Sequence, residues 1–303
     1  MLLTLSAAGA QPLASIPTSD SKIVRRWSLP GDPHGIALGA DGTVYVGLAQ
    51  PQAVVAIDPS HGTIKKRVVL DSAEIAATKE LVSLRTNADR TRLYIANGSD
   101  ESATILALPA MRIVREITIE GEPIRDALPD PGGRYLYLLG HRVHVYDANG
   151  NEELHTIEID DPSAIAATST QLAVIARGRA TIFNTSDFSE ARSAATGKDI
   201  DAALFAGHAL VLLGRDALYR VGQSVEPICL PNGSGPQIAT LGANGLLLLA
   251  ERRCNSSALL SAASLYGVDA YAIAYDAAQN LLYTTERAGY LTIYKVPRPA
   301  VAH

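Results

Sequence analysis

The run from Asp147 to Glu158 carries the residue types of a calcium-binding loop. Asp147, Asn149, Asn151 and Glu153 alternate along it, and Glu158 stands at the twelfth position, where an EF-hand loop has its bidentate carboxylate. The sixth position is a glutamate, although the sharp turn of that loop needs glycine, and β-type runs flank the segment. We therefore interpret Asp147 as a residue that closes a hairpin turn, not as a metal ligand.

Two histidines bear on metal binding, and several short motifs bear on catalysis. His141 and His144 are three residues apart in a β-type run, where alternating side chains point to opposite faces, so the two rings cannot share one ion. The sequence has no HExxH, no Gly-x-Ser-x-Gly and no phosphate-binding loop. We predict no metal, no cofactor and no assembled catalytic group.

The chain has two cysteines, Cys229 and Cys254. They fall in neighbouring repeat units, so a disulfide that closes a loop of about 25 residues is possible. The alternative is two unrelated thiols. Neither cysteine has a histidine nearby in the sequence, which argues against a nucleophile.

The remaining candidates for chemistry stand at the starts of short β-type runs. Their mixed charges, with one imidazole and one phenol, could bind a small polar or anionic ligand or a peptide. The alternative is that these positions are polar because they face water. They are His34, Arg85, Arg125, Asp126, Asp201, Gln237 and Tyr271.

The candidate residues can form one site only if the fold brings the starts of their β-type runs together. A repeated unit in the sequence does this. The clearest copy spans 33–70 and contains four β-type runs, HGIAL, TVYVGLA, AVVAID and TIKKRVVL. Between the runs lie turn-forming residues such as Asp41-Gly42 and Pro59-Ser60-His61-Gly62. Four strands joined by tight turns predict an antiparallel meander.

The unit recurs at intervals of about 40 residues, the length of a four-stranded β-propeller blade. No segment keeps a helical periodicity for more than two turns, and the best helical candidate, 71–79, is short. We therefore predict an all-β, seven-bladed propeller of four-stranded antiparallel blades. First strands are expected to start near Gly35, Leu81, Ile124, Ala164, Asp201, Pro236 and Ala270.

The two ends of the repeat region are expected to share the last blade. That repeat supplies three strands and stops before Pro297, whereas Lys22–Leu29, KIVRRWSL, resembles the outer strands of other repeats. Such pairing would remove an open sheet edge. We predict one propeller domain over 22–303, with the seven candidate residues at the mouth of its channel.

Residues 1–21 are expected to lie outside the propeller. Met1–Ala10 is apolar and ends in Ala8-Gly9-Ala10, a pattern that signal peptidases prefer. We interpret it as the remnant of a leader, with Gln11 as the first mature residue and a polar tether after it. A periplasmic or secreted protein follows from this interpretation, and a cytoplasmic protein with an alanine-rich terminus is the alternative.

Composition excludes several classes of protein. Hydrophobic residues make up 47% and charged residues 19% of 303 residues, which is typical of a globular chain. A formal net charge of −5 argues against nucleic-acid binding, and no apolar run approaches the roughly 20 residues of a membrane-spanning helix. We expect a monomer that is not embedded in a membrane.

The first three repeats resemble the YVTN-type β-propeller repeat family. The resemblance rests on 33–38 (PHGIAL), Asp41-Gly42, 44–46 (VYV) and 55–59 (VAIDP), and the second repeat matches at 93–97 (LYIAN). It weakens in the fourth to sixth repeats. The resemblance implies the propeller fold and an extracytoplasmic location, and it implies no reaction.

Three functions fit this sequence. The first is a non-catalytic extracytoplasmic propeller that binds a protein or a small polar ligand at the channel mouth. The second is a hydrolase or isomerase resembling seven-bladed lactonases, which would use His34 and Arg125 with Asp126 or Asp201. The third, a propeller subunit of a quinone-dependent dehydrogenase, needs a partner chain. We expect the first.

Overall fold

The computed structural model describes most of the chain as strands joined by turns. It describes residues 11–18, 20, 22–49, 52–70, 82–98, 101–197, 199–214, 217–229, 238–241, 247–250, 262–265 and 270–296. These residues contain strands and no helix, and accordingly none that is long and apolar enough to cross a membrane. The leader interpretation of Met1–Ala10 and the helical candidate at 71–79 lie outside the described residues.

The first blade has the four strands that the sequence predicted. They pair antiparallel in chain order as β3 (Pro33–Leu38), β4 (Val44–Ala49), β5 (Gln52–Asp58) and β6 (Thr63–Val69). Asp41 closes the first turn, because its carboxylate accepts the backbone N–H of Thr43 at 3.0 Å and its hydroxyl at 2.9 Å. Side-chain acceptors of this kind replace backbone partners in tight turns.

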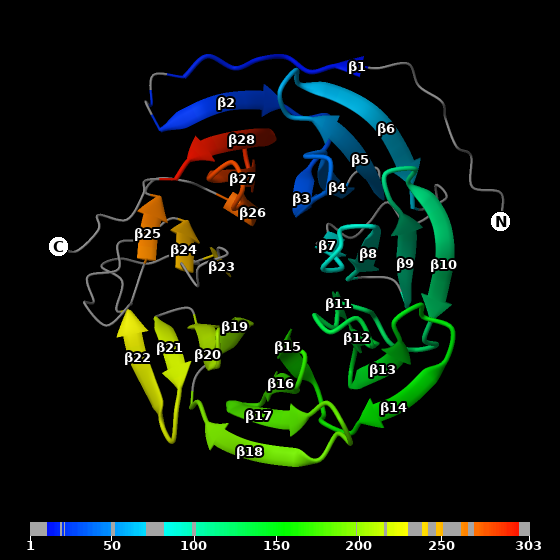
Figure 1. Cartoon of the computed structure of the whole chain (residues 1–303), viewed down its shortest axis with the longest axis vertical. Coiled ribbons are helices and arrows are strands. Elements are labelled where there is room, and N and C mark those ends of the chain that lie inside the picture. The colour runs from blue at the N-terminus through cyan, green and yellow to red at the C-terminus, as the bar shows by residue number, and fades with distance from the viewer. Residues whose placement is uncertain are drawn as a thin grey trace. The chain divides into compact units, whose positions relative to one another are not determined.

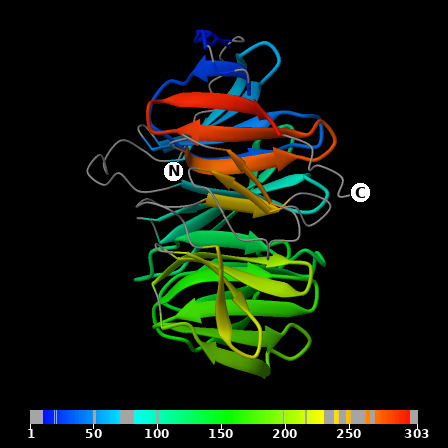
Figure 2. The same ribbon diagram turned by 90° about the vertical axis from the view of Figure 1, so that its left-hand side faces the viewer.

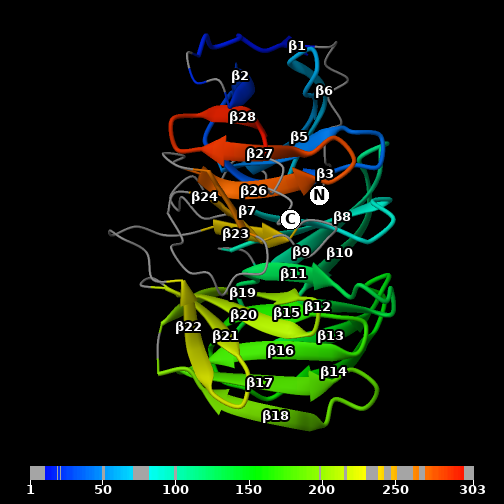
Figure 3. The same ribbon diagram turned by 60° about the vertical axis from the view of Figure 1, so that its left-hand side comes forward.

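Four further blades follow as antiparallel meanders along the chain (Figure 1). Figure 3 shows β15 to β18 lying side by side in that order. Their strands are β7 (Val82–Thr86), β8 (Arg92–Asn97), β9 (Ser102–Ala107) and β10 (Arg112–Thr118), then β11 (Asp126–Pro129), β12 (Tyr135–Leu139), β13 (Val143–Asp147) and β14 (Glu153–Ile157). They continue as β15 (Pro162–Ala167), β16 (Gln171–Ala176), β17 (Arg179–Asn184) and β18 (Glu190–Ala195), then β19 (Ile200–Ala206), β20 (Ala209–Gly214), β21 (Leu218–Val221) and β22 (Val225–Cys229).

Both ends of the described chain form the last blade, as predicted. Its strand order is β2 (Ile23–Ser28), β28 (Tyr290–Lys295), β27 (Leu281–Glu286) and β26 (Ala270–Asp276). Figure 2 shows the red and orange strands β28, β27 and β26 side by side. Pairing of β2 with β28 is antiparallel, with Trp27 opposite Leu291.

The described residues form six such blades, so the expected count of seven is wrong. The segment assigned to the remaining blade contains a three-stranded sheet of β23 (Ile238–Leu241), β24 (Leu247–Ala250) and β25 (Ala262–Leu265). β24 pairs with β25 in parallel, which a tight hairpin cannot produce. The run LLLLA at 246–250 has no polar alternation and no Asp-Gly turn after it, so its sequence specifies pairing weakly.

Burial on both faces of the blades explains their continuous apolar runs. The chain forms two compact units, Met1–Pro129 with Asp269–Lys295, and Asp130–Val268 with Val296–His303. In the first unit, Val44 and Val46 of β4 pack in one core cluster and Tyr45 packs in another. Because successive side chains of a strand point to opposite faces, β4 contributes to packing on both sides of its blade.

The segment expected to be a tether instead adds to the outside of two blades. β1 (Gln11–Pro12) is a fifth strand on β6, and Ser15 bridges to Trp27 of β2. Figures 1 and 3 both show β1 beyond the outer strand β6. Outer strands carry backbone groups that otherwise have no strand partner, which is why an extended segment can add there.

Candidate functional site

The first strands of neighbouring blades meet in the first unit. β3 packs between β26 and β7, and β11 packs beside β7 (Figure 1). His34, Asp126 and Tyr271 stand at the beginnings of β3, β11 and β26, and Arg85 stands near the end of β7. Two pairs of them are in contact, Arg85 with Asp126 and His34 with Tyr271.

Arg85 and Asp126 join β7 to β11 through a two-point ion pair. Arg85 Nη2 donates to Asp126 Oδ2 at 2.9 Å and its Nε donates to Oδ1 at 3.3 Å. The Ser83 hydroxyl donates to the same Oδ1 at 2.6 Å. Such a fork fixes the plane of the guanidinium, and Nη1 takes no part in the pair.

The ion pair holds both groups charged at neutral pH. Burial alone would raise the pKa of Asp126, but the charge of Arg85 and hydrogen bonds from Arg85 and Ser83 lower it below its ordinary value of 3.8. The Asp126 carboxylate raises the pKa of Arg85 in turn. The Asp126 side chain is 13% exposed and that of Arg85 is 48% exposed, so the guanidinium is both positioned and open to solvent.

His34 and Tyr271 join β3 to β26. Their ring centroids are 4.3 Å apart at an interplanar angle of 31°, and the Arg287 guanidinium lies 5.2 Å from the Tyr271 ring centre, within the range of a cation–π contact. His34 Nε2 lies 3.3 Å from a carboxylate oxygen of Asp32. The Thr285 hydroxyl donates to the backbone carbonyl of His34.

Burial makes His34 a poor general base in this conformation. The residue is 4% exposed, and neither ring nitrogen is open to solvent or has a well-aligned hydrogen bond to any described residue. A general base must come within hydrogen-bond reach of the proton that it takes. The imidazole here packs against the Tyr271 ring, and both of its nitrogens are buried.

Two of the other three predicted site residues are exposed. Arg125 is exposed immediately before β11, and Asp201 is exposed in β19, which belongs to the second unit. Gln237 lies outside the described residues. Four of the seven predicted residues are therefore in contact as two pairs.

Sequence reasoning missed the partners Ser83, Asp32 and Arg287. Ser83 could have been found, because it stands two residues before Arg85 in a strand and must share its face. Asp32 precedes its strand and Arg287 lies in the turn before β28, so no periodicity marked them.

The loop that resembles an EF-hand is a hairpin turn, as interpreted. Asp147 accepts backbone N–H groups of Asn151 and Glu152. His144 Nδ1 lies 2.8 Å from Glu153 Oε1, and His141 is exposed. Within the described ranges, no three His, Cys, Asp or Glu side chains gather as metal ligands would.

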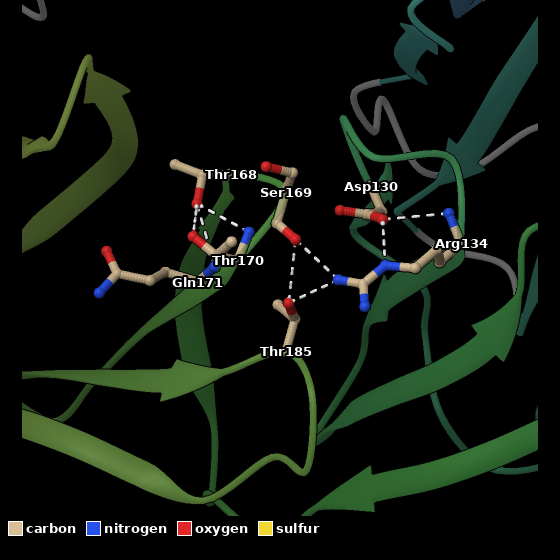
Figure 4. A network of polar contacts seen from close by, with 7 residues as sticks. All are labelled: Asp130, Arg134, Thr168, Ser169, Thr170, Gln171 and Thr185. Atoms are coloured by element: carbon tan, nitrogen blue, oxygen red, sulfur yellow. Dashed lines mark hydrogen bonds and ion pairs between the residues drawn. The ribbon is translucent and has the colours of Figure 1, made fainter.

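A polar network around Arg134 in the second unit is structural (Figure 4). Arg134 Nη2 donates to the Ser169 carbonyl and to the Thr185 hydroxyl, both at 2.7 Å. Its backbone N–H donates to Oδ2 of the buried Asp130 at 3.0 Å. All these partners lie in turns or at strand ends, so the guanidinium ties one blade's turn to the next blade.

The proposed disulfide cannot be placed. Cys229 ends β22, but its side chain and the whole of Cys254 lie outside what the structure describes. The pairing stays a prediction.

No protein-family model matches the chain, and no curated protein matches it in sequence.

Proposed function

We propose that this protein is a non-catalytic binding propeller that holds a small polar or anionic ligand, or a segment of a protein, at the channel mouth. The Arg85–Asp126 pair supports this proposal most strongly. Asp126, itself held by the Ser83 hydroxyl, fixes a guanidinium whose side chain is still 48% exposed. A positioned guanidinium of this kind suits carboxylate and phosphate acceptors.

A lactonase-like activity is the second proposal, and the geometry at His34 weakens it. Its ring nitrogens are buried, whereas a base would need one of them near the substrate. We expect no turnover on a panel of lactones. If a lactone is hydrolysed and His34→Ala abolishes the rate while the protein stays folded, binding is not the whole function.

Ligand binding is tested by thermal stabilisation with succinate, citrate, gluconate and inorganic phosphate. Saturation at 100 times Kd stabilises a protein by about 2.7 kcal/mol, so we expect at least one probe to raise Tm by several degrees. Arg85→Met should abolish that shift, because it removes the guanidinium.

Arg142→Met is the matched control for this experiment. Arg142 is also 48% exposed and also paired, to Glu158 at 3.3 Å, but it lies on a different blade. Its loss should leave the probe's shift unchanged. A shift that survives Arg85→Met, or no shift with any probe, contradicts the proposed site.

We also propose a location outside the cytoplasm and a relation to YVTN-type repeats. The Ala8-Gly9-Ala10 pattern and the repeat residues of the first blade support these proposals. Mass spectrometry of the mature protein from fractionated cells tests the location. We expect envelope or secreted material that begins at Gln11, and an intact amino terminus in the cytoplasmic fraction contradicts it.

A further inference from the structure

The amino-terminal segment 11–16, here named the strap, crosses the outer edges of two blades. Gln11 and Pro12 pair with Ile64 and Thr63 of β6. The Leu13 N–H donates to the Gly62 carbonyl at 2.6 Å. The first half of the strap therefore belongs to the first blade.

The second half of the strap pairs with β2 of the last blade. The Ser28 N–H donates to the Ala14 carbonyl and the Ile16 N–H donates to the Arg26 carbonyl, both at 2.9 Å. The strap is thus one extended segment that adds to two neighbouring sheets. We name the edge that it covers, Gly62–Ile64 with Arg26–Ser28, the seam edge.

Two apolar side chains anchor the strap. Leu13 and Ile16 are half-buried, whereas the other four strap residues are exposed, and Leu13 packs on the core cluster of the first and last blades. Beneath it, Trp27 donates from Nε1 to the Pro59 carbonyl at 3.0 Å and so links the two blades. The contact is small, with few backbone bonds and two anchors.

We propose that the seam edge is a strand-acceptor site whose partner is the strap of a second copy of this chain. The cis contact shows the chemistry that fits: an extended segment with apolar side chains three residues apart. Identical contacts form in trans, and a reciprocal exchange closes as a two-fold dimer.

The connection between the strap and β2 decides whether the strap binds its own chain or a second copy. The short connection of residues 17–22 gives the cis strap an effective concentration in the millimolar range. The protein is therefore a monomer at micromolar concentration. Exchange requires release of the strap at protein concentrations that approach about 1 mM.

The first experiment uses the full chain with Leu13→Asp and Ile16→Asp, which detach the strap without shortening the protein. The probe is a synthetic peptide of residues 11–18, QPLASIPT. Trp27 is the chain's one tryptophan and lies at the seam edge, so its fluorescence reports occupancy. We expect a saturable change with this peptide and none with the peptide that carries Leu13→Asp.

The second experiment uses the unaltered chain, concentrated to about 1 mM, warmed to below Tm and cooled. We expect a dimer by size-exclusion chromatography, which Leu13→Asp should reduce at least tenfold. No saturable response to the peptide overturns the acceptor site. If the peptide changes the fluorescence but no dimer forms, a second copy is not the partner. If the dimer still forms with Leu13→Asp, the strap is not the exchanged element.

Discussion

Gly62 lets the first and last blades pack closely, because it has no side chain where the Trp27 ring lies. Its φ is +62°, and a Cβ built on it would come within 2.4 Å of the Trp27 ring. The backbone conformation and the close approach both require glycine. The ring can then reach the Pro59 carbonyl across the turn.

We predict that Gly62→Ala lowers the free energy of unfolding by more than the roughly 1 kcal/mol that the left-handed backbone costs an alanine. Trp27 must move, so its fluorescence should change as well. Gly207→Ala is the control, because Gly207 has the same φ of +62° with no atom within 4 Å of its Cβ position. Urea unfolding measures both variants, and equal losses would contradict the role of the ring contact.

A second prediction concerns the pH dependence of the Asp126 carboxylate. Its pKa is lowered in the folded protein by Arg85 and Ser83 against the effect of burial. The resulting stability is present above the ordinary carboxyl value of 3.8 and is lost as the pH falls through the folded pKa. The difference in unfolding free energy between the natural protein and Asp126→Asn should therefore shrink below about pH 4.

Asp160→Asn is the control for that titration. Asp160 pairs with Arg177 at 3.5 Å on the surface, and both side chains are about 70% exposed. Surface pairs of this kind contribute little, so its difference from the natural protein should stay small at every pH. A difference for Asp126→Asn that does not change with pH would argue against the ion pair as its source.

At the level of strands, the last blade depends on a pair that joins the two ends of the chain. Arg26 of β2 donates from Nη2 to Glu286 of β27 at 3.3 Å and from Nε to the Thr292 hydroxyl at 3.0 Å. The Tyr294 hydroxyl donates to the same carboxylate at 3.0 Å. The Glu286 side chain is 8% exposed, so these partners take the place of water around its carboxylate.

We predict that Arg26→Met lowers the free energy of unfolding by about 2 kcal/mol or more, because it leaves a buried carboxylate without its cation. The double variant Arg26→Met/Glu286→Gln should lose less than the sum of the two single losses, which far-UV circular dichroism in urea can measure. An additive result would show that the pair contributes nothing to closure of the blade.

The strands of the first blade could be predicted because local signals agreed there. Two of its turns are closed by side chains that hydrogen-bond to the backbone, those of Asp41 and Asp58. The region 238–265 lacked those signals, and regular spacing alone suggested a blade that the parallel pair of β24 and β25 contradicts. The contacts of Arg85 with Asp126 followed from strand order, but the burial of His34 depends on Tyr271 from the far end of the sequence.

At the scale of the whole molecule, we predict a disulfide between Cys229 and Cys254. We predict that the unfolded, unreduced protein shows no free thiol in a quantitative titration and shows two after reduction. Cys229→Ser should then lower the free energy of unfolding by about 3 kcal/mol, the loop-entropy value for this spacing. Two thiols before reduction would leave the pair as unrelated cysteines.

The last blade contains strands from both ends of the chain, so it can be completed only late in synthesis. Arg26 bonds to Thr292, 266 residues later, and translation at 5–20 residues per second makes that interval roughly 15 to 50 s. Throughout this time β2 has left the ribosome without β28, its partner strand in the blade. Nascent molecules that stall before β28 should thus be the most vulnerable to proteases, and completion of the polypeptide, rather than emergence of any earlier meander, should mark the moment at which resistance appears.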